Sequence, residues 1–411
     1  MPNTSDILVI GAGIIGVTCA LELARQGLKV QVLDRQAPGR GASFGNAGHL
    51  ATEQVFPIAD LSILKRLPAM LLDPMGPLRL DWRYLPRALP WFTRLLLNLR
   101  PAPFAGTVEG LRQLNQASLP AWQRMLASIG HSELLHLQGS LLMYEKPESH
   151  TALQALQQRM RQQQVAVEQW RADQLHRAAP ELDRRAQGGL FFPETGHFID
   201  PYTTLLAVVE AARQAGVGFI QSEVLAGQVL ADSVTLQTAQ GQLSSRRVLI
   251  ATGAHSASLV KSLTGVQVPL DTERGYHLML PNETGRLPFA VTSFERRFIM
   301  TPMAGGLRLA GTVEFAGLER PPNHERAWQL LRLSQGLFEQ ALDAEGATPW
   351  MGFRPSLPDS LPVIDQACGG RVLLAFGHQH LGLTQAAATA ELVGALAAGR
   401  PAPERFRVDR F

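Results

Sequence analysis

The chain has 411 residues, of which 45% are hydrophobic and 18% are charged. This composition excludes disordered, coiled-coil and collagen-like proteins, and it predicts a compact, soluble α/β protein of two or three domains. The formal net charge is only +3 and no long basic run is present, so nucleic acid is not an expected partner.

The N-terminal segment carries no feature of a targeting sequence. Residues 1–13 lack the basic start of a signal peptide, and no run in the chain approaches the roughly 18 uninterrupted apolar residues of a transmembrane helix. We therefore expect a cytoplasmic protein. The two cysteines, Cys19 and Cys368, match no zinc-binding or CxxC spacing, so neither a metal site nor a disulfide framework is expected.

The first chemical signal is a strand, a glycine turn, a helix and a second strand in that order. Apolar residues 6–10 lead into Gly11-Ala-Gly13-Ile14-Ile15-Gly16, a helix is predicted over 17–26, and a strand over 28–33 ends at Asp34. In such a unit the three glycines allow a tight turn, approach of a pyrophosphate and close helix packing, and the acid binds a ribose diol. The pattern predicts a dinucleotide site and disfavours NADP, but it does not separate FAD from NAD.

Three later segments also end in small residues. Residues 41–49 contain Phe44 as their only bulky side chain before His49. Each of the segments 247–255 and 371–384 begins as an apolar strand and ends in a turn of small residues. Ligands bind at the carboxyl edge of open α/β sheets, where these turns are expected to lie. The N-terminus of the helix predicted after the last turn carries partial positive charge, which suits the anionic N1–C2=O region of a reduced flavin.

Together with Gly352-Phe-Arg354-Pro-Ser-Leu-Pro-Asp359, these segments resemble the FAD-dependent oxidoreductases of the D-amino-acid oxidase fold, and most closely the bacterial D-amino-acid dehydrogenases. The resemblance runs almost end to end. It implies an α/β fold in which a Rossmann-type FAD-binding domain is interleaved with a mixed-sheet α+β substrate domain. The expected segments are 1–58, 192–262 and 348–411 for the FAD-binding domain, and 59–191 and 263–347 for the substrate domain.

The resemblance also implies which residues hold FAD. The flavin is expected over residues 43–48, and Val224, at the end of a strand over 218–224, is expected to make backbone contacts to adenine. The implied cofactor residues are Gly11, Gly13, Ile14, Ile15, Gly16, Asp34, Arg35, Ala42, Ser43, Asn46, Ala47, Gly48, Val224, Ala251, Thr252, Gly253, Gly377, His378, Gly382, Leu383 and Thr384. The counterparts of the family's covalent attachment sites, the 353–354 region and Gly45, offer no nucleophile, so non-covalent FAD is expected.

Oxidation of an amine beside a carboxylate requires a cation that holds the carboxylate and a site that excludes water. Arg354 is the expected clamp, because a guanidinium matches a carboxylate in a bidentate geometry and the family's matching arginine has this role. The resemblance places the stretch 273–277 across the substrate cavity, where Tyr276 either hydrogen-bonds the carboxylate, shapes the pocket or is a core tyrosine. Histidines near the expected flavin edges, which could accept an amine proton, are His49, His277, His378 and His380. The catalytic candidates are therefore Arg354, Tyr276, His49 and His378. A substrate amine that is bound in its neutral form can lose hydride without a base, so a catalytic base is not required.

Residues 55–104 combine prolines, leucines and arginines in a basic amphipathic pattern. Two interpretations stay open: peripheral docking on the anionic inner-membrane face beside the respiratory chain, or helices that cap the active site with arginines outward. Further along, helices are predicted over 107–129, 148–164 and 322–345, a helix begins at Asp200-Pro201, and strands are predicted over 264–311.

The expected function is FAD-dependent oxidation of a small neutral or cyclic D-amino acid to the imine or 2-oxo acid. The loop 377–384 is similar to that of bacterial enzymes acting on D-proline and cis-4-hydroxy-D-proline. A sarcosine-type secondary-amine oxidase and a flavin subunit of a larger dehydrogenase are the alternatives. Either O₂ or a respiratory quinone is the expected electron acceptor.

Overall fold

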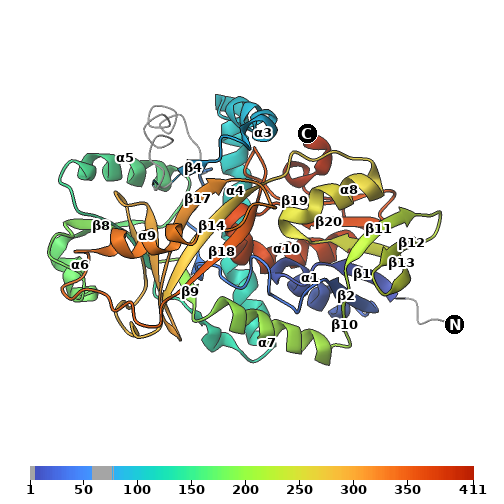
Figure 1. Ribbon diagram of the computed structural model, residues 1–411, viewed down its shortest axis with the longest axis horizontal. Helices are drawn as coiled ribbons and strands as arrows, with labels where there is room; N and C mark the ends of the chain where they lie inside the picture. The colour runs from blue at the N-terminus through green and yellow to red at the C-terminus, as the bar shows by residue number, and fades with distance from the viewer. Residues whose placement is uncertain (1–4, 58–75, 77) are drawn as a thin grey trace.

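The computed structural model describes every residue except 1–4, 58–75 and 77, and its two large sheets occupy the two halves of the molecule (Figure 1). The sheet on the right of the view, the parallel sheet, has five parallel strands. In spatial order they are β10 (Gly218–Gln221), β2 (Val30–Asp34), β1 (Ser5–Ile10), β13 (Gly241–Ile250) and β20 (Val372–Phe376). Antiparallel strands extend it: β11 (Val224–Val229), β12 (Val234–Thr238) and β19 (Val363–Ala367).

Helices cover both faces of the parallel sheet, which is why its strands are almost continuously apolar. In β1, Ile7 and Val9 pack toward one face, and Leu8 and Ile10 pack toward the other. The first face is covered by α1 (Ile14–Arg25), α7 (Pro201–Gln214) and α10 (Gly382–Ala397), and the second by α8 (Ser256–Thr264). The Asp200 carboxylate accepts from the Thr203 N–H at 2.7 Å, which confirms the predicted start of α7.

The second large sheet, the mixed sheet, forms the other half of the molecule. Its strand order is β18 (Thr348–Ser356), β14 (Asp271–Leu280), β17 (Gly306–Phe315), β16 (Phe298–Met303), β15 (Ala290–Ser293), β6 (Ser140–Tyr144), β8 (Gly188–Phe192) and β7 (Glu168–Arg171), and β4 (Leu78–Leu80) pairs with β17. The core on this side is continued by α9 (Glu325–Ser334) and α6 (Ala172–Ala178), and α5 (Ser149–Gln162) packs beside β8. The antiparallel strands predicted over 264–311 are therefore present.

Two connections join the halves. The long helix α4 (Pro101–Ser128), which follows α3 (Leu85–Asn98), packs Leu111, Leu114 and Trp122 into the core of the parallel sheet beside α10. A small sheet of β3 (His49–Leu50), β9 (Gly196–Phe198) and β5 (Leu135–His136) pairs segments from both halves. The chain thus crosses repeatedly between the two sheets, as expected for an interleaved fold.

Three details differ from the sequence-based expectations. The strand predicted over 218–224 ends at Gln221, and Val224 begins the separate strand β11. Strand β18, although it lies within 348–411, pairs along its length with β14 in the mixed sheet. The helix predicted over 322–345 is confined to α9, because the backbone leaves the helix at Gln335 and enters the left-handed region at Gly336 with a φ of 72°.

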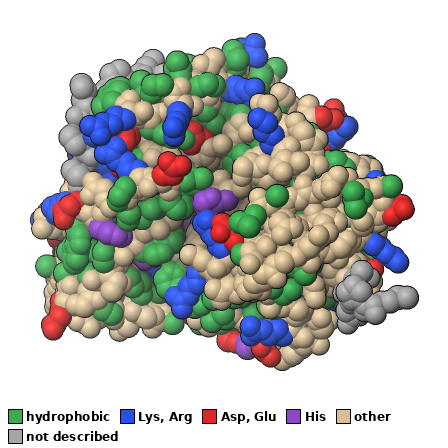
Figure 2. Space-filling view, turned by 45° about the vertical axis from the view of Figure 1, so that its right-hand side comes forward, with side chains coloured by type: hydrophobic (Ala, Val, Ile, Leu, Met, Phe, Trp, Pro, Cys, Tyr) green, Lys and Arg blue, Asp and Glu red, His purple; other side chains and the backbone are tan. Residues whose placement is uncertain are grey.

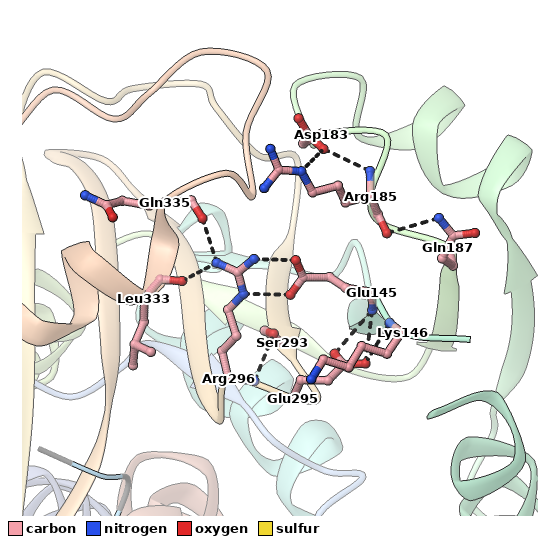
Figure 3. A network of polar contacts seen from close by, with 10 residues as sticks. All are labelled: Glu145, Lys146, Asp183, Arg185, Gln187, Ser293, Glu295, Arg296, Leu333 and Gln335. Atoms are coloured by element: carbon pink, nitrogen blue, oxygen red, sulfur yellow. Dashed lines mark hydrogen bonds and ion pairs between the residues drawn. The ribbon is translucent and has the colours of Figure 1, made fainter. Parts of the chain in front are cut away.

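A polar network holds the end of α9 against the strands of the mixed sheet (Figure 3). The Arg296 guanidinium binds both carboxylate oxygens of Glu145 and donates to the carbonyl oxygens of Leu333 and Gln335, at 2.6 and 2.7 Å. Glu295 accepts from the backbone N–H groups that follow β6. Because Arg296 binds the last carbonyls of α9, it satisfies groups that a helix C-terminus leaves open.

Candidate active site

A cavity of about 600 Å³ lies at the carboxyl edge of the parallel sheet and extends to the β14–β18 edge of the mixed sheet. Its wall contains residues from all of the small-residue turns, which lie far apart in the sequence. Ile10 and Gly11 lie at the turn that follows the first strand, and Ala251 to Gly253 lie in the turn of the segment 247–255. Gly382 and Leu383 belong to the last segment, 371–384. The predicted meeting of these turns at one sheet edge is therefore present.

The first glycine turn is built to let another backbone come close. Gly11 has a φ of 108°, and a Cβ there would lie 2.4 Å from the Ala251 carbonyl oxygen, so no other residue fits without displacement. The Ala12 N–H donates to an Asp34 carboxylate oxygen at 2.8 Å, and the Ile14 N–H donates to Ser43 Oγ at 2.9 Å. These bonds fix the turn and the N-terminus of α1 at the cavity.

Most of the expected cofactor residues line this cavity. They are Gly11, Gly13, Ile14, Ile15, Asp34, Arg35, Ala42, Ser43, Asn46, Ala47, Val224, Ala251, Thr252, Gly253, His378, Gly382 and Leu383. Four others lie behind the wall and support it. Gly16 packs on the Gly11 carbonyl, Gly48 on Met303, and Gly377 on Leu357, while Thr384 Oγ1 accepts from the Ala51 N–H at 3.0 Å.

Arg354 extends from β18 into the cavity wall. Its guanidinium lies over Gly275 of the neighbouring strand, where a Cβ would come within 2.4 Å of Cζ and Nη2. Nη1 donates to the Thr312 carbonyl at 3.1 Å, which is the only hydrogen bond that the described residues make to this side chain. Burial lowers the pKa of Arg354, and the Glu273 carboxylate, directly across the strand pair, offsets part of that effect.

The Thr312 carbonyl reaches Arg354 through a β-bulge. Pairing of β14 with β17 shifts between Arg274 and Tyr276, so that Thr312 and Val313 together face Gly275. Thr312 has a φ of 60°, an unfavourable conformation for a β-branched residue. The bulge therefore holds one donor of Arg354 and leaves the rest of its guanidinium for a ligand.

Tyr276 belongs to the cavity wall, but its hydroxyl is bound within the fold. Side chains alternate along β14, so the Tyr276 ring points away from Gly275 and packs in the core of the mixed sheet. Its hydroxyl donates to Glu314 Oε2 at 2.5 Å. Burial and this carboxylate raise the pKa of Tyr276 to about 12. The core interpretation of Tyr276 is the one that the structure supports.

His49 does not line the cavity. In β3 its Nδ1 contacts the Gly196 carbonyl at 3.1 Å and its Nε2 contacts Glu53 Oε1 at 3.0 Å. Burial alone would lower the pKa of His49, but the Glu53 carboxylate and these hydrogen bonds raise it above its ordinary value. The expected catalytic role of His49 therefore lacks a geometric basis, because both ring nitrogens already have protein partners.

His378 lies in the cavity wall, but its imidazole is bound to the fold. Nε2 is 3.0 Å from Thr389 Oγ1 on α10, and burial lowers the pKa of His378 to about 3. His380, two residues further on, also lines the cavity and contacts Gln54 through Nε2. Burial and the positive charge of Arg354 lower the pKa of His380 to about 3 as well. Both rings are therefore neutral at ordinary pH.

Gly275 and Trp350 are among the wall residues that sequence reasoning missed. Gly275 makes room for Arg354, and Trp350 faces the cavity from the same strand as Arg354. The only available signal was indirect: Gly275 falls within the stretch 273–277 that was expected to cross the substrate cavity. Their importance depends on the register of β14 against β18, which motifs do not specify.

A glycine-lined cavity at the edge of a parallel sheet, beside one incompletely bonded arginine, is typical of enzymes that bind a dinucleotide next to an anionic substrate. The family model for FAD dependent oxidoreductases, DAO, matches residues 6–396, and the chain belongs to this family. The turn at Gly11 and Gly13 fits the FAD that the family requires, because it lines the cavity at the N-terminus of α1, where backbone N–H groups bind a pyrophosphate.

Individual relatives match along almost the whole chain. A D-amino-acid oxidase of Bradyrhizobium diazoefficiens is 35% identical, over 97% of this chain and 96% of that protein. A D-amino acid dehydrogenase of Vibrio atlanticus is 27% identical, over 96% of each chain. The crystal structure of glycine oxidase from Geobacillus kaustophilus superposes with a TM-score of 0.76 over 99% of both chains at 20% identity, which shows the shared fold.

Proposed function

We propose that this enzyme oxidises the Cα–N bond of a small neutral or cyclic D-amino acid, such as D-proline or cis-4-hydroxy-D-proline, to the imine or 2-oxo acid. The observation that carries the proposal is Arg354, a guanidinium that the fold positions but leaves mostly unbonded at the cavity. The names of the relatives, a D-amino-acid oxidase and a D-amino acid dehydrogenase, support a D-amino acid as the substrate.

Arg354 would bind the substrate carboxylate through a charge-assisted pair, which is strongest as a bidentate contact in a site sheltered from water. Bound FAD supplies the acceptor for the hydride that leaves Cα. The neutral rings of His378 and His380 keep a second positive charge away from the substrate amine. An amine bound in its neutral form then needs no side chain to take a proton at the moment of oxidation.

The first test is anaerobic reduction of the flavin in the purified enzyme. A panel of D-proline, cis-4-hydroxy-D-proline, D-alanine, their L-isomers and sarcosine should bleach the flavin absorbance only with D-amino acids. Bleaching by sarcosine alone would identify a secondary-amine oxidase, and no bleaching by any compound would favour a flavin subunit that depends on a partner. Oxygen uptake compared with reduction of a soluble quinone then identifies the electron acceptor.

The attachment of FAD is tested by acid precipitation. Neither Phe353, Arg354 nor Gly45 carries a side chain that attaches flavin covalently in this family, so the yellow colour should pass entirely into the supernatant. Flavin that stays on the precipitated protein would show a covalent bond.

We also propose that α3 rests on an anionic membrane surface. Part of the basic segment 55–104 lies outside the described residues, but α3 and the turn before it are described. Trp82, Leu89, Leu96 and Leu97 are each about half exposed there. The exposed arginines between them are Arg83, Arg87, Arg94 and Arg100, and none has an acidic partner among the described residues. Basic and hydrophobic side chains are intermixed over the top of the molecule, where α3 lies (Figure 2).

Such a face combines apolar insertion with attraction to anionic lipid headgroups. None of the described helices is long and apolar enough to cross a membrane. Vesicles containing phosphatidylglycerol should therefore float the enzyme, phosphatidylcholine vesicles should not, and 0.5 M salt should weaken the binding. A Leu89→Asp, Leu96→Asp variant should lose flotation, whereas Leu206→Asp, on exposed α7, should keep it. Equal flotation of all variants would contradict a role for α3.

A further inference from the structure

Two glycines face each other in the β14–β18 pair and are both covered by a side chain from β18. Gly275 and Gly352 are direct partners in the register. The Arg354 guanidinium occupies the space of a Cβ on Gly275, and the Trp350 indole occupies that of a Cβ on Gly352, at 2.1 Å from Cη2. Alternation along β18 places both side chains on the same face of the strand.

Arg354 and Trp350 are therefore neighbours, and both side chains lie over glycines, Gly275 and Gly352. Directly opposed residues of an antiparallel pair lie roughly 5 Å apart, so the guanidinium and the edge of the indole are separated by about that distance. Both residues belong to the cavity wall. This separation is comparable to the distance from the carboxylate of an amino acid to its own side chain or ring.

The position of the indole is fixed from the far side. Trp350 stacks on His277, its register partner, with ring centroids 5.0 Å apart and planes 20° from parallel. His277 Nδ1 donates to the Gly45 carbonyl at 2.8 Å, and a Cβ on Gly45 would collide with both rings. Burial and the charge of Arg308 lower the pKa of His277 to about 3, so the ring beneath the indole is neutral.

We propose that Trp350 is the specificity-determining residue of this enzyme, and that its indole packs against the side chain or ring of the amino acid whose carboxylate Arg354 holds. This inference deepens the proposed function and rests on it. Contact with an apolar indole favours hydrocarbon, and it disfavours a side-chain carboxylate, which would lose water without gaining a partner. A cationic substrate side chain would be repelled by the positive charge of the Arg354 guanidinium. The surface therefore selects neutral substrates with an apolar side chain or a saturated ring.

The test measures binding of two carboxylates to the oxidised holoenzyme from the change in flavin absorbance. Acetate presents a carboxylate alone, and cyclopentanecarboxylate adds a saturated five-membered ring. Trp350→Ala should weaken cyclopentanecarboxylate about tenfold and acetate less than twofold, because only the ring loses buried contact. Trp350→Phe should recover most of the ring affinity. Arg354→Ala should weaken both ligands, and Leu230→Ala, at an exposed apolar side chain outside the cavity wall, should change neither.

Trp350→Leu, which keeps apolar bulk without an aromatic face, provides a second measurement if Trp350→Ala retains too little FAD. It should bind cyclopentanecarboxylate with intermediate affinity. Equal weakening of acetate and cyclopentanecarboxylate in the Trp350 variants, unchanged affinity for both, or a wild-type enzyme that binds neither would overturn the inference. The proposed function fails separately, when no D-amino acid bleaches the flavin of the wild-type enzyme.

Discussion

Arg296 and Arg354 belong to the same half of the molecule, and they differ in how far the protein completes their hydrogen bonds. Arg296 binds both oxygens of Glu145 and two carbonyls at the end of α9 (Figure 3). Arg354 binds one carbonyl, that of Thr312. Arg274, on the strand beside Arg354, resembles Arg296, because it is fully buried and bound to the carbonyls of Gly317 and Arg320.

The comparison separates arginines whose donors are bound within the fold from Arg354, which we propose binds the substrate carboxylate. A guanidinium has five N–H donors, and burying them without acceptors is unfavourable. Arg274 and Arg296 find their acceptors within the chain, so their contribution is to stability. Arg354 leaves donors open at a cavity, which is stable only if water or a bound anion satisfies them. Substitutions in the two groups should therefore affect different measurements.

The largest expected effect is that of Arg354→Ala on catalysis. A charge-assisted bidentate pair with a carboxylate contributes about 1.5–3 kcal/mol, so kcat/KM for D-amino acids should fall about ten- to two-hundredfold. FAD content and unfolding free energy should stay near wild type. Arg354→Lys should recover only part of the loss, because an ammonium keeps the charge without the planar fork. Wild-type turnover by an Arg354→Ala enzyme that retains FAD would remove Arg354 from the substrate site.

Arg296→Ala is the matched variant in the other group. It removes the partner of the partly buried Glu145 and leaves two carbonyls at the end of α9 unpaired. The unfolding free energy of the holoenzyme in urea should fall by about 2–3 kcal/mol. At a temperature where the variant is folded, its kcat/KM should lie within twofold of wild type. A large catalytic loss with unchanged stability would break the distinction between the two arginines.

Gly275→Ala tests whether the bare backbone beneath Arg354 is required. The new Cβ would lie 2.4 Å from the guanidinium carbon, so the side chain must move from its position. We expect about a tenfold fall in kcat/KM, mainly through KM, since a displaced clamp weakens carboxylate binding. Gly305→Ala, where φ is not positive and the nearest atom, Met279 Cε, would lie 3.6 Å from the added Cβ, is a control for glycine replacement. Wild-type KM in Gly275→Ala would show that Arg354 tolerates the shift.

The smallest expected effect concerns His378, whose imidazole is bound to Thr389. Its folded pKa of about 3 lies below the ordinary value near 6.5, so the unfolded chain takes up a proton that the folded chain refuses. Stability that is complete above pH 6.5 is therefore lost as the pH falls toward 3, by about 1.4 kcal/mol per pH unit. Between pH 6 and 5, His378→Asn should reduce the slope of the unfolding free energy against pH by about 1.4 kcal/mol per pH unit, which corresponds to the uptake of one proton. An unchanged slope would place the imidazole in contact with solvent.

The parts of the site that depend on local sequence were predictable, and those that depend on strand register were not. The turn at Gly11 and the acid Asp34 belong to one βαβ unit, whose spacing fixes their arrangement. Arg354 was identified from a family resemblance. Tyr276 was a candidate because the family resemblance places the stretch 273–277 across the cavity, but alternation along β14 turns its ring to the other face. The burial of His49 against Gly196 depends on a pairing between segments almost 150 residues apart.

The way the cavity is assembled also determines when it can first exist. Its wall includes Ile10 and Gly11 from the first strand and Gly382 and Leu383 after the last strand to join the parallel sheet. A nascent chain in which β20 has not yet been synthesised lacks part of the sheet edge. It also lacks the N-terminus of α10, which completes the wall. The complete cavity wall can therefore form only after nearly the whole chain has been synthesised.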